Sequence, residues 1–166
     1  RLTRLRRGLF APGAVPLDWT HPSTYAPFLA QSPAGSVVSH ESSGRVAGLW
    51  LPSPEDARVQ LTTADRPLPS DRSVRRHRAV LPPDDVVLRG GIPFTSVERT
   101  AIDLALGRPL RQALVALDSA SRVLALGEAA RTPAGRELLA STAGRRLEEA
   151  ARQRLGAAVA RAAGRT

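Results

Sequence analysis

The stretch VRRHRAVLPPDDVVLRGGIPFTSVERTAIDLA, residues 74–105, decides the fold of this chain. Its first part, 74–80, alternates as a strand does and leads into a turn rich in Pro and Asp. Residues 86–88 and 92–94 then flank the sequence Arg-Gly-Gly, which is typical of a β-hairpin. After the hairpin the apolar spacing becomes helical. The stretch therefore predicts a strand, a hairpin and a helix, in that order.

The helix that follows the hairpin has its own start and stop signals. Thr95 and Glu98 have the spacing of a capping box, in which the hydroxyl accepts a backbone N–H and the carboxylate reaches back. Gly107 is the expected end of the helix. Arg99 and Asp103 stand four residues apart, so we expect a local ion pair rather than a catalytic role for them.

Two more strands and a short helix are expected closer to the N-terminus. Residues 58–63 alternate with a period of two, and residues 37–38 are an apolar strand end. Ser39 is predicted to cap the next helix, the small Ser42 would let that helix approach a neighbour closely, and Trp50 would lie on its apolar face.

Together these patterns predict an α+β fold, in which a small mixed or antiparallel sheet with packed helices is followed by a helical C-terminal segment. We expect three parts along the chain. Residues 1–12 form a basic β element, residues 13–130 form the α/β body, and the Ala- and Arg-rich residues 131–166 form a helical tail or linker.

The charge is strongly positive and uneven. The 166 residues carry 24 basic and 15 acidic side chains, a net charge of +9, and every basic one is Arg. Residues 1–8 hold four Arg and no acid, and residues 131–166 hold eight Arg against three acids. A GC-rich coding sequence is one explanation of the Arg bias. Whatever its origin, this charge attracts polyanions such as nucleic acid.

Composition also excludes several kinds of site. The chain has no Cys and no Lys, which removes disulfides, thiolate metal sites, Walker P-loops and Schiff bases. His21, His40 and His77 lack the spacing of metal ligands, so we expect no metal and no cofactor. No apolar run is long enough to span a bilayer, and a cytoplasmic location without membrane contact is expected.

The remaining polar candidates favour structural roles. Ser39 and His40 suggest a nucleophile and a base, but adjacent side chains rarely face each other and no G-x-S-x-G turn surrounds them. A helix cap followed by a first-turn histidine is the favoured interpretation. His77 is expected to pack or hydrogen-bond across strands, and Asp84 and Asp85 to belong to a turn.

The arginines are the candidates for nucleic-acid binding. Arg4, Arg6 and Arg7 adjoin a turn at Gly8, where a basic hairpin can reach phosphates; a solvated charge run is the alternative. Arg76 and Arg78 would share one face of the strand at 74–80, and they are weaker candidates.

Several of these motifs resemble one family, the actinobacterial AbiEi-like antitoxins of type IV toxin–antitoxin systems. The resemblance lies in Ser39-His40-Glu41-Ser42 with Gly48-Leu49-Trp50, Val74 with His77-Arg78, Gly91-Ile92-Pro93-Phe94-Thr95-Ser96, Arg99-Thr100 with Asp103-Leu104-Ala105, and Asp118-Ser119-Ala120. It covers roughly residues 1–130. Gly44 departs from the family, which usually has Ala there.

The resemblance implies a non-enzymatic, DNA-binding transcriptional autorepressor of a phage-defence operon. Residues 4–10 resemble the wing of the family's winged-helix domain, so the recognition helix would lie upstream and this chain would be a fragment. The expected partners are operator DNA, bound by the full-length protein, and a second copy in a homodimer; no stable toxin contact is expected. The alternative is an accessory, non-catalytic domain of an endonuclease of the very-short-patch-repair type.

Overall fold

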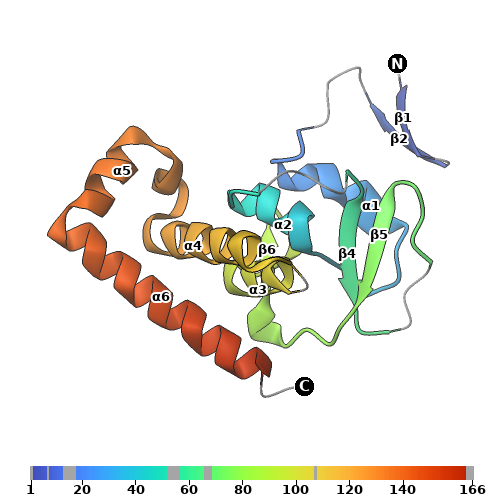
Figure 1. Ribbon diagram of the computed structural model, residues 1–166. Helices are drawn as coiled ribbons and strands as arrows, with labels where there is room; N and C mark the ends of the chain where they lie inside the picture. The colour runs from blue at the N-terminus through green and yellow to red at the C-terminus, as the bar shows by residue number, and fades with distance from the viewer. Residues whose placement is uncertain are drawn as a thin grey trace.

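The computed structural model describes residues 2–6, 8–12, 18–51, 57–65, 69–106 and 108–163. In chain order, its elements are β1 (Leu2–Arg6), β2 (Leu9–Pro12), η1 (Pro22–Tyr25), α1 (Ala26–Ala30), β3 (Val37–Val38), α2 (His40–Ala47), β4 (Val59–Thr63), β5 (Val74–Arg78), η2 (Pro83–Asp85), β6 (Val86–Arg89), β7 (Ile92–Thr95), α3 (Val97–Ala105), α4 (Leu110–Leu126), η3 (Gly127–Arg131), α5 (Pro133–Ala140) and α6 (Thr142–Ala163). Figure 1 shows the β1–β2 hairpin at the opposite end of the molecule from α5 and α6.

The body is built on a mixed five-stranded sheet with the order β5-β4-β3-β7-β6. β4 runs parallel to β5, and β3 runs antiparallel to β4 but parallel to β7. β6 and β7 form the predicted hairpin. Gly90 and Gly91 both have positive φ, 57° and 77°, as a tight turn of this hand requires. The α+β prediction is confirmed.

One face of the sheet is covered by η1 and α1. The core on this side consists of Tyr25, Phe28, Val38, Val59, Leu61, Val74 and Phe94. The Tyr25 ring lies edge-on to the Phe94 ring, with centroids 5.6 Å apart, and its hydroxyl donates to the Trp19 carbonyl at 2.8 Å. This interaction fastens the loop before η1 to the sheet.

The other face carries α2 and α3, with α4 and α6 packed behind them. Successive residues of a strand point to opposite faces, so Thr62 faces away from the core that holds Leu61. Its hydroxyl donates to Ser39 at the start of α2, 2.8 Å away. A second core then joins α2, α3, α4 and α6 through Leu49, Val97, Ala101, Leu104, Ala116, Ala120 and Leu155.

Helix α6 packs on the body through an apolar stripe along one of its faces. Ala151, Leu155 and Ala158 of α6 are buried, and Arg154 donates to Glu98 of α3 at 2.7 Å. Leu147 and Val159, which also belong to that stripe, remain 45% and 41% exposed. No helix in the described part of the chain has the length and apolarity to cross a bilayer.

The capping box predicted for α3 is wrong by one residue. The N-cap is Ser96, whose hydroxyl accepts the Arg99 backbone N–H at 3.1 Å. Thr95 is the last residue of β7, and its hydroxyl lies 2.7 Å from that of Thr100. Glu98 does not reach back to a cap, because it pairs with α6. The expected end at Gly107 lies outside the described residues.

The helix predicted to include Trp50 ends earlier than expected. α2 stops at Ala47, and Gly48 follows with a φ of +86°, the left-handed conformation of a glycine C-cap. Trp50 therefore lies beyond the helix and is 63% exposed rather than on an apolar face.

Candidate functional site

Five of the motif residues meet in one polar cluster between the sheet and the helices α2 and α3. They are Ser39, His40, His77, Arg99 and Asp103. The sequence separates them by up to 64 residues, and the parallel pairing of β4 with β5 brings His77 beside the start of α2. We call these five residues the polar cluster.

Two histidine rings stack at its centre. The His40 and His77 centroids are 3.6 Å apart, and the ring planes differ by 14°. His40 has a positive φ of 50°, which is a strained conformation for a residue with a side chain. His77 Nε2 lies 3.1 Å from Gln60 Oε1 on the neighbouring strand. The cross-strand role predicted for His77 is thus confirmed.

The adjacent Ser39 and His40 do face each other, contrary to expectation. Ser39 Oγ lies 3.0 Å from His40 Nδ1, the distance of a nucleophile hydrogen-bonded to its base. However, Ser39 has no exposed surface, and its hydroxyl also accepts the Thr62 hydroxyl. Ser39 occupies the predicted N-cap position but makes no side-chain capping bond. The arrangement locks β4 to α2 and leaves a substrate no path to the hydroxyl.

Burial sets the protonation of His40. Burial, together with the positive charges of Arg99, Arg75 and Arg108, lowers the pKa of His40 to about 4. The ring is therefore neutral at neutral pH. Its 4.0 Å approach to the Asp103 carboxylate is then a polar contact rather than an ion pair.

Arg99 holds two carboxylates in place. Its Nε donates to Asp103 Oδ1 at 2.8 Å, which confirms the predicted ion pair, and its Nη1 donates to Asp85 Oδ2 at 3.3 Å. The Asp103 side chain is 4% exposed, and its second oxygen has no hydrogen-bond partner among the described residues. Burial raises the pKa of Asp103, while the Arg99 guanidinium acts in the opposite direction.

Buried hydroxyl groups connect the same elements. Ser42 Oγ accepts the Gln60 backbone N–H at 2.9 Å, and Ser43 Oγ donates to the Thr95 carbonyl at 3.0 Å. Thr100 Oγ1 in turn donates to Ser43 Oγ at 3.0 Å. The small residues of α2 thus allow the helix to lie close to β4, β7 and α3, and hydrogen bonds of their hydroxyl groups connect these elements.

The candidate nucleic-acid contacts are spread over two places. Arg4 on β1 and Arg78 on β5 are exposed. The side chain of Arg6 and all of Arg7 lie outside the described part. Arg76 is turned inward: its side chain is 5% exposed, and its Nη1 donates to the Pro69 carbonyl at 2.8 Å and to Asp71 at 3.3 Å. Arg76 is therefore removed from the candidate contacts.

One buried charge pair was not foreseen from the sequence. Glu41 is 3% exposed and accepts a hydrogen bond of 2.6 Å from Arg108, and Arg45, four residues further along α2, lies 3.7 Å from its other carboxylate oxygen. Arg108 comes 67 residues after Glu41, just before α4. The signal in the sequence is a Glu placed next to the small residues Ser42, Ser43 and Gly44.

Within the described ranges, no group of three His, Asp or Glu side chains could hold a metal ion. Comparisons of the chain with protein-family models, curated proteins and solved structures find no match.

Proposed function

We propose that this chain is a DNA-binding transcriptional autorepressor of the AbiEi-like antitoxin kind, and that it acts in the cytoplasm without catalysing a reaction. In this proposal the β1–β2 hairpin contacts DNA phosphates, and the α/β body holds the hairpin in position.

The hairpin is the observation that carries the proposal. β1 and β2 pair as a sheet of their own, with Arg4 opposite Phe10 and Gly8 at the turn with a φ of 76°. Arg4 is exposed, and Phe10 is 52% exposed. A basic two-stranded ribbon is a shape that fits a DNA groove while its side chains reach phosphates.

The attachment of the hairpin and the charge of the chain agree with this role. Gln31, directly after α1, donates to the Gly8 carbonyl at 3.2 Å and so ties the turn to the body. The net charge of +9 favours association with a polyanion.

A structural role for the polar cluster supports the non-catalytic part of the proposal. Ser39 is fully buried, Asp103 is paired with Arg99, and His77 is stacked on His40. The side chains most suited to acid–base or nucleophilic chemistry therefore join strands to helices.

A binding assay with matched variants tests the proposal. Fluorescence anisotropy of a labelled DNA duplex would be followed for the wild type, Arg4→Gln and Arg111→Gln. Arg111 is an exposed arginine of α4, so both variants lose the same charge. We expect Arg4→Gln to weaken binding severalfold and Arg111→Gln to have little effect. Equal effects of the two variants would contradict a contact through the hairpin.

A further inference from the structure

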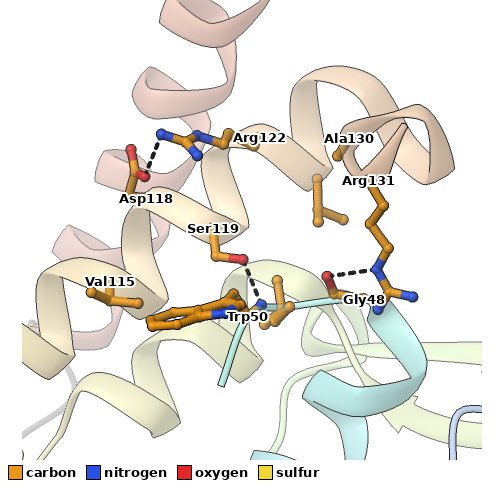
Figure 2. A pocket seen from close by; sticks show the side chains of 10 residues that line it. Gly48, Trp50, Val115, Asp118, Ser119, Arg122, Ala130 and Arg131 are labelled. Atoms are coloured by element: carbon orange, nitrogen blue, oxygen red, sulfur yellow. Dashed lines mark hydrogen bonds and ion pairs between the residues drawn. The ribbon is translucent and has the colours of Figure 1, made fainter. Parts of the chain in front are cut away.

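We infer that a hollow beside Trp50 binds a nucleotide, with the base stacked on the indole and the phosphate held by arginines. The hollow has a volume of about 690 Å³ and lies between the end of α2, the middle of α4 and η3. This size is within the range of small-molecule sites. Figure 2 shows Trp50, Arg122 and Arg131 on three different sides of the hollow. The inference does not depend on the hairpin contact proposed above.

Trp50 supplies the flat surface. Its backbone N–H donates to Ser119 Oγ at 2.7 Å, so the main chain is pinned to α4, while the residue remains 63% exposed. An indole that is fixed at its base and open to solvent is a stacking platform for another planar ring. Leu49, Val115 and Val123 add apolar walls to the hollow.

Arg131 is positioned by the glycine that ends α2. Its Nε donates to the Gly48 carbonyl at 3.1 Å. A Cβ at residue 48 would lie 2.6 Å from Arg131 Nη2, so only glycine lets the guanidinium lie this close to the backbone. Arg131 is exposed and lines the hollow, where the terminal N–H groups of its guanidinium can donate to a phosphate.

Arg122 adds a second cation, which can bind an incoming anion in place of its present partner. It pairs with Asp118 at 2.9 Å, and the two side chains are 52% and 46% exposed. Exposed pairs of this kind contribute at most about 1 kcal/mol, so a phosphate competes readily for the guanidinium. Two arginines and one aspartate leave the lining with a charge of +1, which suits an anion better than a neutral ligand.

A ligand with a flat aromatic ring and a phosphate fits the exposed indole of Trp50 and the guanidinium groups of Arg131 and Arg122. It can come from a free mononucleotide or from an unpaired base in single-stranded nucleic acid. Bases stacked within a DNA duplex cannot reach the indole, so this site is distinct from the proposed duplex contact.

Isothermal titration calorimetry of the full chain tests the inference. The ligands would be adenosine monophosphate, adenosine and a short single-stranded oligonucleotide, each at millimolar concentration. We expect the monophosphate, the oligonucleotide or both to bind, and adenosine to bind at least about tenfold more weakly because it lacks the phosphate. Binding of the oligonucleotide alone would identify nucleic acid as the source, and binding of the monophosphate would identify the free nucleotide.

Variants assign the binding to the hollow. Trp50→Ala should weaken it by roughly five- to a hundredfold, and Arg131→Gln by about tenfold. The control is Arg136→Gln, an exposed arginine of α5 outside the lining, which should leave affinity unchanged. Circular dichroism would verify that each variant is folded. The inference is overturned if neither phosphate-bearing ligand binds, if adenosine binds as well as its monophosphate, or if Trp50→Ala binds like the wild type.

Discussion

Replacing Arg99 by Met should lower the free energy of unfolding by much more than the loss of an exposed arginine does. Arg99 is 17% exposed, and it is the guanidinium that holds both Asp103, 4% exposed, and Asp85, 18% exposed. Met keeps much of the side-chain volume but leaves the Asp103 carboxylate buried without a cation. Breaking a buried pair on one side costs about 3–5 kcal/mol; because Arg99 retains some contact with water, we expect about 2–4 kcal/mol.

A second Arg–Asp pair in the same chain provides the control. Arg122 and Asp118 have the same spacing and nearly the same distance, 2.9 Å against 2.8 Å, but both are about half exposed. Arg122→Met should therefore cost only about 0.5 kcal/mol or less. Urea unfolding followed by circular dichroism measures both variants at pH 7.

The double variant Arg99→Met, Asp103→Leu separates lost attraction from stranded charge. Removing the carboxylate as well should recover much of the stability, because the cost of a broken buried pair comes mainly from the charge left behind. If Arg99→Met loses no more stability than Arg122→Met, or if the double variant is as unstable as the sum of its parts, the reasoning about this cluster is refuted.

Three other changes test separate parts of the structure. The pKa of His40 is about 4 in the folded state and about 6.5 in the unfolded state, so between these pH values the unfolded chain binds more protons. The free energy of unfolding should therefore fall by up to about 3 kcal/mol from pH 6.5 to pH 4. Urea titrations should find this loss reduced in His40→Gln but not in His21→Gln, a variant at an exposed histidine. The raised pKa of Asp103 acts in the opposite direction above pH 3.8. Ser96→Ala should cost about 1 kcal/mol in urea unfolding through loss of the α3 cap, whereas Thr132→Ala, a cap on the exposed α5, should cost less. Gly48→Ala should lower the thermal midpoint, at a cost of at least about 1 kcal/mol, because residue 48 has a φ of +86° and contacts Arg131; no change in the midpoint would refute this packing.

Local patterns were sufficient for most of the secondary structure. The Gly90-Gly91 turn, the alternation of residues 59–63 and the pair Arg99–Asp103 each depend on neighbours a few residues away, and each was predicted. The predicted cap of α3, Thr95, differs from the observed cap, Ser96, by one residue because both are good capping residues. Which of them continues the strand is decided by the Thr95–Thr100 hydroxyl contact across β7 and α3.

Long-range contacts account for what sequence reasoning missed. Nothing near His40 indicates that His77 stacks on it, because that contact depends on the parallel register of β4 and β5. The inward turn of Arg76 depends in the same way on Asp71, in the loop before the strand. The exposure of Trp50 follows from the early end of α2 at Gly48, a glycine C-cap that lies within the stretch of helical apolar spacing.

The salt dependence of duplex binding tests the central proposal most directly. If the basic hairpin neutralises phosphates, the logarithm of affinity should fall with the logarithm of salt concentration by about 0.9 per contact. The variant Arg4→Gln, Arg6→Gln, Arg7→Gln should then flatten that slope by up to about 3 units. A wild-type affinity independent of salt, or a slope unchanged in the triple variant, would contradict the proposal that this hairpin contacts DNA.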